Sequence, residues 1–143
     1  MDESDYRSLQ AKRGGVGFSE EDLAAAHEIL GGKALPEDLV LFFRYFGRDH
    51  RPLFGYDYDM TLEGLRDAVT TAWDMERDHG PLFPEGAILL AQHQGYEVMY
   101  LTVDGVFVVA ESGSEKPDCW RPAESFNAFV EQAVAKGPPR LFD

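Results

Sequence analysis

Cysteine is almost missing from this sequence, and long apolar runs are missing altogether. Cys119 is the only cysteine in 143 residues, so one chain cannot build a disulfide framework or a cysteine-rich zinc site. No apolar run approaches the roughly 18 residues that a membrane span needs, and the start MDESDYRSLQ lacks the basic and apolar regions of a signal peptide. These absences favour a cytoplasmic protein without a membrane partner.

Basic side chains are also scarce. The 13 Lys and Arg residues face 26 Asp and Glu residues, which gives a net charge of −13. Because affinity for nucleic acid comes largely from cationic side chains that displace counterions from phosphates, we expect no nucleic-acid partner. The same field would steer a basic protein toward this chain. An acidic surface that only keeps the protein soluble is the alternative that composition leaves open.

Sequence motifs of known chemistries are missing as well. The chain has no GxSxG, no phosphate-binding P-loop and no HExxH, and its four histidines are scattered. His93 ends an apolar run just before Gly95, a position that favours a turn between two strands over a catalytic role. Asp57 and Asp59 would share one face of a strand, as a general acid and base pair requires, but a solvated acidic edge explains them better. We therefore expect no catalytic residues, no metal and no cofactor.

Helical spacing of apolar residues dominates the first half of the chain. One helix is predicted after Ser19 as N-cap, a second with Pro36 in its first position, and a third after Thr61 as N-cap. The expected stop signals are Gly31, Gly47 and Gly80. In the third helix the side chains expected to face the core are Leu62, Leu65, Val69, Ala72 and Trp73. The link RDHRPLFGYDYDM between the second and third helices predicts irregular structure with a short edge strand around residues 53–58.

From Ala87 onward the composition changes to β-branched and aromatic residues. Strands are predicted over residues 87–91, 97–103 and 106–111, joined by turns at Gln94-Gly95 and at Asp104-Gly105, with a further short strand near residues 119–121. A last helix is expected to bury Phe126, Phe129, Val130 and Ala133. The chain therefore predicts a single α+β domain.

The order of these segments resembles the SUKH superfamily, whose namesakes include the yeast Smi/Knr cell-wall regulators. The likeness runs over residues 19–136 and rests on LPEDLVLFFRYFG, FPEGAILLAQHQGYEVMYL, the hairpin followed by VFVVAE, and AESFNAFVEQAV. The resemblance implies an α+β fold with a curled, mainly antiparallel sheet and helices packed against it.

The resemblance also implies a function without catalytic residues. Bacterial members of the superfamily are regarded as immunity proteins that neutralise toxins of polymorphic toxin systems, often nucleases or deaminases. The eukaryotic branch implies the alternative of a regulatory adaptor that binds several proteins. A third alternative, a small hydrolase or ligand-binding domain, would require a deep pocket with converging polar groups.

The densest acidic stretch, residues 57–78, is the predicted docking site for a basic toxin domain. Its predicted residues are Asp57, Asp59, Glu63 and Asp67, with Tyr56, Tyr58 and Trp120 as aromatic contacts. Glu63 and Asp67 lie four apart in a helix, where like charges cost roughly 0.2 to 0.5 kcal/mol. Compensation of that cost by Arg66 and Arg77 within the chain is the structural alternative. The oligomeric state is left open.

Overall fold

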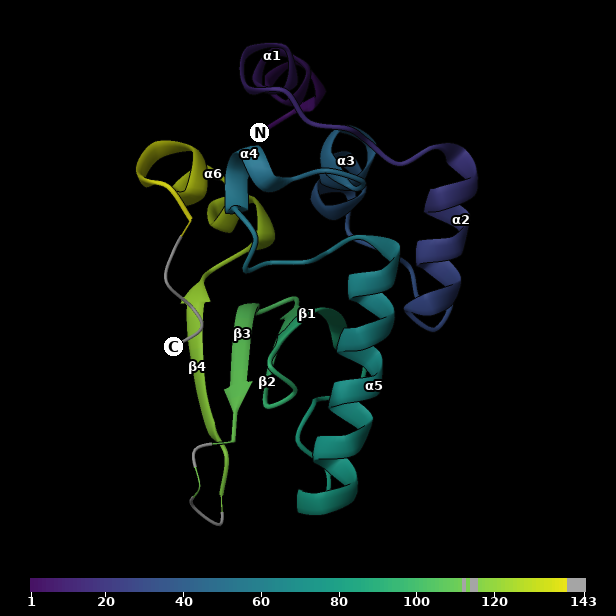
Figure 1. The fold of residues 1–143 in the computed structure, drawn as a ribbon, viewed down its shortest axis with the longest axis vertical. Coiled ribbons are helices and arrows are strands. Elements are labelled where there is room, and N and C mark those ends of the chain that lie inside the picture. The colour runs from purple at the N-terminus through teal and green to yellow at the C-terminus, as the bar shows by residue number, and fades with distance from the viewer. Residues whose placement is uncertain (112, 114–115, 139–143) are drawn as a thin grey trace.

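The computed structural model describes residues 1–111, 113 and 116–138. Within them the chain forms six helices and one four-stranded sheet, which confirms the α+β class (Figure 1). The elements are α1 (Glu3–Arg13), α2 (Glu20–Ile29), α3 (Glu37–Phe46), α4 (Arg51–Phe54), α5 (Leu62–His79), β1 (Ile88–His93), β2 (Glu97–Thr102), β3 (Gly105–Ala110), β4 (Asp118–Ala123) and α6 (Phe126–Lys136). No described helix is long and apolar enough to cross a membrane.

The sheet is an antiparallel meander in the order β1-β2-β3-β4, as the turn residues predicted. Gln94 and Gly95 both have positive φ, 52° and 78°, in the β1–β2 turn. In the β2–β3 hairpin, Thr102 already pairs with Gly105. The Asp104-Gly105 signal therefore located this hairpin to within one residue.

The predicted helices begin and end close to their expected signals. Ser19 caps α2 through its side chain, which accepts a hydrogen bond from the Asp22 N–H. Pro36 is the N-cap of α3, and not its first helical residue as predicted, because its ψ of 146° is not helical. Gly47 ends α3. A Cβ added to Gly47 would lie 2.5 Å from the Phe18 ring, so a larger residue does not fit at this position.

The predicted edge strand around residues 53–58 was wrong. The segment contains the end of the one-turn helix α4, and Gly55 follows with a φ of 65°. Leu53 and Phe54 are both buried, and the Phe54 ring stacks on Phe129 of α6 at 5.1 Å. Two adjacent buried side chains are incompatible with an edge strand of alternating faces, whereas one helical turn accommodates them.

Helix α1 was not predicted from the sequence. Asp2 and Asp5 form a capping box at its start. Tyr6 is fully buried and Leu9 nearly so, and both belong to the main core. This packing extends the core beyond the stretch 19–136 on which the family resemblance rests.

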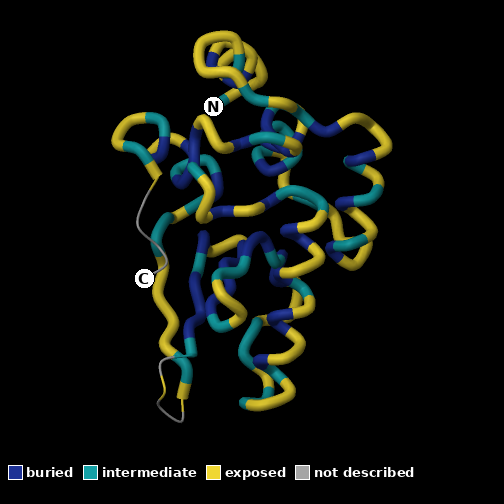
Figure 2. Tube along the Cα trace, in the orientation of Figure 1, coloured by how far each residue is buried: buried dark blue, intermediate teal, exposed yellow. Residues whose placement is uncertain are grey.

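The two faces of the sheet pack into separate apolar clusters. Met99 and Leu101 belong to the cluster that contains the phenylalanines of α3 and α6. Val98 and Tyr100 point the other way and pack with Met75 of α5. In Figure 2, β3 is mostly buried, whereas β4 and the outer side of α5 are largely exposed. Helix α5 packs on this second face of the sheet, mainly against β1 and β2, whereas β4 is the edge strand farthest from β1 (Figure 1).

Candidate functional site

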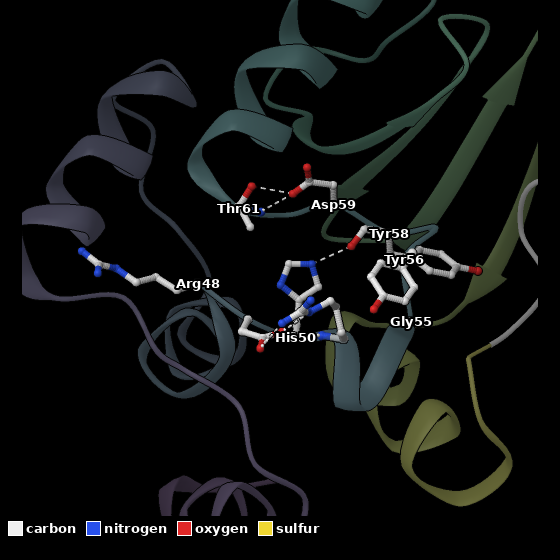
Figure 3. A pocket seen from close by; sticks show the side chains of 9 residues that line it. Arg48, His50, Gly55, Tyr56, Tyr58, Asp59 and Thr61 are labelled. Atoms are coloured by element: carbon white, nitrogen blue, oxygen red, sulfur yellow. Dashed lines mark hydrogen bonds and ion pairs between the residues drawn. The ribbon is translucent and has the colours of Figure 1, made fainter.

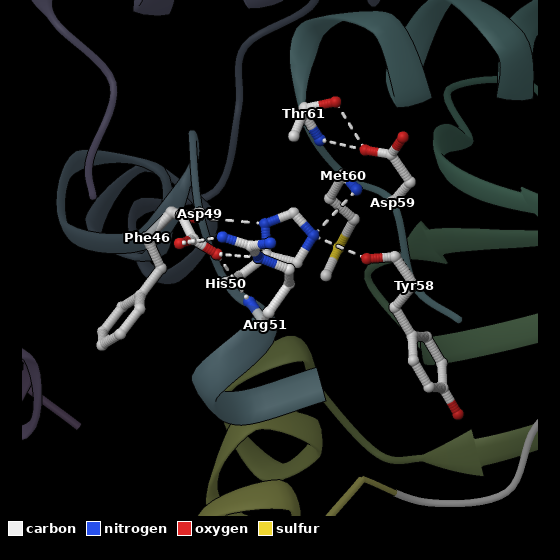
Figure 4. A network of polar contacts seen from close by, with 8 residues as sticks. All are labelled: Phe46, Asp49, His50, Arg51, Tyr58, Asp59, Met60 and Thr61. Atoms are coloured by element: carbon white, nitrogen blue, oxygen red, sulfur yellow. Dashed lines mark hydrogen bonds and ion pairs between the residues drawn. The ribbon is translucent and has the colours of Figure 1, made fainter. Parts of the chain in front are cut away.

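The segment that links α3 to α5 is organised around His50. Its ring is buried, with 3% of the residue exposed. Nδ1 lies 3.2 Å from the carbonyl oxygen of Phe46, and Nε2 lies 2.5 Å from that of Tyr58 and 3.0 Å from the backbone nitrogen of Met60 (Figure 4). One side chain thus holds together the end of α3 and the approach to α5.

Burial sets the protonation of this histidine. Loss of hydration lowers the pKa of His50, although the carbonyls of Tyr58 and Phe46 act in the opposite direction. We therefore assign the neutral ring, whose two nitrogens both lie within hydrogen-bond distance of backbone groups: Nδ1 faces the Phe46 carbonyl, and Nε2 faces the Tyr58 carbonyl and the Met60 N–H. A ring with no spare nitrogen has a structural role and is not available as a general base.

A pocket of about 250 Å³ opens beside His50, between α4 and the start of α5 (Figure 3). Its lining residues are Arg48, Asp49, His50, Arg51, Gly55, Tyr56, Tyr58, Asp59 and Thr61. Three kinds of group therefore meet here: charged groups of both signs, an exposed aromatic ring and a buried histidine. The pocket includes three predicted docking residues, Tyr56, Tyr58 and Asp59.

Arg51 is held in place at this pocket by Asp49. Its Nε and Nη2 donate to the two carboxylate oxygens of Asp49 at 2.8 and 2.9 Å. These bonds lower the pKa of Asp49 to about 2. The guanidinium carbon lies 5.6 Å from the centre of the Tyr56 ring, within cation–π range. Tyr56 is 85% exposed, so its ring is supported from one side and open to solvent on the other.

Arg48 is directed away from the pocket centre. Its Nε donates to Asp22 of α2 at 2.6 Å, a bond that lowers the pKa of Asp22 to about 2. In Figure 3 the Arg48 side chain accordingly extends toward α2. Arg48 and Arg51 are both engaged with carboxylates, so neither supplies an uncompensated positive charge to the pocket.

Asp59 lies in the pocket wall and also helps to start α5. One of its carboxylate oxygens accepts hydrogen bonds from the backbone N–H and the hydroxyl of Thr61, at 3.0 and 2.5 Å. The Thr61 oxygen in turn accepts from the Gly64 N–H and caps the helix. Asp59 is therefore part of the fold as well as a candidate contact.

The remaining predicted docking residues do not all present exposed side chains at this pocket. Asp57 is exposed beside Tyr56, but Tyr58 is 3% exposed and packs on Phe54 and Phe129, so it offers no contact area to a partner. Trp120 is 37% exposed on β4. Trp120 is not among the residues that line the pocket, so it does not join this site.

Glu63 and Asp67 lie on the exposed side of α5, as predicted. Arg77 forms ion pairs with Asp74 at 3.2 Å and Asp78 at 3.9 Å. Among the described residues, however, no ion pair involves Glu63, Asp67 or Arg66. Arg77 therefore compensates negative charge at the end of α5. The carboxylates of Glu63 and Asp67 at its beginning form no ion pair among the described residues.

Trp73 was predicted to face the core, and that prediction was wrong. The residue is 74% exposed. Leu65, Ala68, Ala72 and Met75 complete the buried face of α5, and Trp73 lies on its outer side. The helical period placed it near the boundary of the apolar face, where spacing alone does not decide the side.

Sequence reasoning also missed His50, Asp49 and Arg51. An Asp and an Arg two positions apart are common on protein surfaces, and burial of a histidine has no local signature. The one usable signal was their place in RDHRP, between two aromatic-rich segments.

No group of His, Cys, Asp and Glu side chains suited to a metal ion occurs in residues 1–111, 113 and 116–138. Comparison of the chain with protein-family models, with curated proteins and with solved structures finds no match.

Proposed function

We propose that this chain is a cytoplasmic immunity protein that binds a basic toxin domain of a polymorphic toxin system and blocks it without catalysis. The observation that carries the proposal is the Tyr56 ring, 85% exposed, supported by Arg51 and adjoining carboxylates that lack ion pairs in the described chain. Exposed tyrosines are enriched among the residues that dominate binding energy in protein interfaces, and charged residues commonly surround them at the rim.

In this mechanism the carboxylates take the place of phosphates. Asp57, Glu63 and Asp67 pair with Lys or Arg side chains that a nuclease or deaminase uses to hold nucleic acid. Tyr56 fills an adjacent part of the cleft, and the Asp49–Arg51 pair holds its ring in position before the partner arrives. The net charge of −13 accelerates the encounter with a basic partner.

The segment order that resembles the SUKH superfamily supports the same proposal. The adaptor function is the second candidate, and it is favoured by the exposed Tyr56 in the same way, because an adaptor also needs an open contact. The two differ in their binding: an immunity protein binds one toxin tightly, whereas an adaptor binds several partners with modest affinity. A small-molecule site in the pocket beside His50 is less well supported, because about 250 Å³ is below the roughly 300 to 1,000 Å³ of typical ligand pockets.

The first test is the genomic neighbourhood, where we expect a gene for a polymorphic toxin with a basic toxin domain, and the second is protection of cells against that domain. Co-expression of the wild-type chain should restore growth, and the purified proteins should associate at a rate that falls with salt. The variant Y56A with D57N, E63Q and D67N should associate more slowly and with a weaker salt dependence. Asp59 stays unchanged in this variant because it supports the start of α5.

Circular dichroism establishes that the variant is folded. Toxicity that the wild-type chain does not relieve would contradict the proposal. Equal salt dependence in the wild type and the variant would remove this surface as the docking site.

A further inference from the structure

The outer side of α5 consists of two parallel stripes of different chemistry. Residues three or four positions apart share one side of a helix. The acidic stripe consists of Glu63, Asp67, Thr70, Asp74 and Asp78, all of them exposed. The tryptophan stripe beside it consists of Leu62, Arg66, Val69, Trp73 and Arg77, of which Leu62 and Val69 are half-buried. Three apolar side chains, Leu62, Val69 and Trp73, with Arg66 among them, therefore run alongside a row of carboxylates.

Trp73 makes no contribution to the core that would account for an indole at this position. The buried side of α5 is filled by Leu65, Ala68, Ala72 and Met75. With 74% of the residue exposed, most of the large apolar surface of a tryptophan remains in water. Tryptophan is also the residue type most enriched among the few residues that dominate binding energy in interfaces.

We propose that the outer side of α5 is a docking surface for a cationic protein segment, with Trp73 as its apolar anchor. This inference rests on the proposed function and extends it from the start of α5 along the helix. The partner places an apolar recess over the indole and Lys or Arg side chains over the acidic stripe. Because an 18-residue helix is a rigid support, these groups are already ordered before binding.

The negative charge of this surface distinguishes between the partners that could bind there. The two stripes together carry four carboxylates, Glu63, Asp67, Asp74 and Asp78, against the two guanidinium groups of Arg66 and Arg77. A second copy of this chain would bring two acidic stripes together, and nucleic acid would bring phosphates toward the same carboxylates. A cationic protein segment is the occupant that this charge favours.

The experiment uses a phage library of random peptides as the probe. The single cysteine, Cys119, is exposed on the edge strand β4 and belongs to neither stripe of α5, so biotin attached there immobilises the chain without modifying the proposed surface. Selection on the wild-type chain should enrich peptides that combine Lys or Arg with apolar residues. An enriched peptide should bind Trp73→Ala about tenfold more weakly or worse, as for other interface anchors.

Two variants serve as matched controls. Val103→Ala removes another exposed apolar side chain, in the β2–β3 turn, and Trp120→Phe alters the other tryptophan; neither should weaken the peptide. Glu63→Gln combined with Asp67→Asn should weaken it and reduce its salt dependence. Since Trp73 is exposed, Trp73→Ala should keep the circular dichroism spectrum and thermal midpoint of the wild type.

Each outcome bears on the inference. No enrichment, enrichment of peptides without cationic residues, or equal binding to Trp73→Ala would overturn it. Toxin neutralisation that is undiminished in Trp73→Ala would also overturn it while leaving the proposed function intact. Peptides that depend on Trp73, together with failure to neutralise the toxin, would support the docking surface and remove the immunity function.

Discussion

The backbone N–H of Met60 donates a hydrogen bond to Nε2 of His50, 3.0 Å away. The bond joins the start of α4 to the approach to α5, and residues 51–59, which include Tyr56 and much of the pocket lining, lie between its two ends. The geometry of the candidate site therefore depends on a side chain that does not itself face the partner.

Replacement of His50 by alanine should destabilise the fold by about 2 to 4 kcal/mol, because it leaves a cavity and removes the acceptor for a buried N–H. Urea unfolding measures the loss. His93→Ala is the control: His93 is only half-buried, at the β1–β2 turn, so the change should cost less than about 1 kcal/mol and leave toxin protection intact. Catalytic turnover lost in folded His93→Ala would instead show an active site there.

Burial of His50 should also make stability depend on pH. Its folded-state pKa lies below the ordinary value of 6.5, chiefly because burial disfavours the charged ring. Above that value the ring is neutral in both states and contributes no pH dependence. As pH falls below it, the unfolded chain binds a proton that the folded chain does not, so stability decreases. The nearby carboxylate of Asp49 stays ionised in this window because its pKa is about 2.

Urea unfolding at about pH 7.5 and about pH 5.5 measures this effect, since the window lies below the unfolded-state pKa. The loss of stability on acidification should be larger in the wild type than in His50→Gln, which has no titrating group at this position. The other histidines are present in both proteins, so the difference between the two isolates His50. An equal loss in both would contradict the assignment of a buried neutral ring.

Asp57 and Asp59 should differ in their effect on stability, although both carry the same charge. Asp59→Ala removes the acceptor for the Thr61 N–H and hydroxyl and should cost about 1 kcal/mol, as the loss of a helix cap does. Asp57→Ala changes an exposed side chain and should stay within about 0.5 kcal/mol of the wild type. Thermal unfolding of the two variants measures both values. Equal midpoints would show that Asp59 has no role in starting α5.

Local signals predicted most of the fold. Ser19 and Thr61 located helix starts through capping chemistry, and the change to β-branched residues after Ala87 located the sheet. The errors have a different origin. Burial of Phe54 and exposure of Trp73 are decided by which elements pack together, and no residue near them in the sequence records that packing.

The same distinction applies to the candidate site. The acidic residues were found because composition reveals charge, and Tyr56 was found because it stands among them. The sequence does not show that Tyr58 is buried on α6, or that Asp49 orders the Arg51 guanidinium beneath Tyr56. These depend on contacts between segments that become neighbours only in the folded chain.

Gly64→Ala should be destabilising, contrary to the usual effect of alanine in a helix. An added Cβ would lie 2.1 Å from the backbone oxygen of Asp59, so the start of α5 would have to shift. This clash should outweigh the gain of about 1 kcal/mol that alanine normally brings over glycine. Thr70→Ala, on the exposed side of the same helix, is the control and should be neutral or slightly stabilising. Chemical denaturation of both variants decides the sign, and a stabilised Gly64→Ala would show that the chain accommodates the Cβ.

Tyr6 provides a test of whether α1 belongs to the cooperative fold. Its hydroxyl is buried and makes no hydrogen bond within the described chain, and burial raises its pKa well above the ordinary value. Tyr6→Phe removes this unsatisfied group and keeps the ring that packs on Tyr45 and Phe46, so it should be neutral or stabilising by about 1 kcal/mol. Tyr6→Ala removes the ring as well and should cost about 3 to 5 kcal/mol. Both values come from urea unfolding followed by circular dichroism. If Tyr6→Ala unfolded at the wild-type midpoint, α1 would be an appendage, and the fold would be confined to the segments whose order suggested the family resemblance.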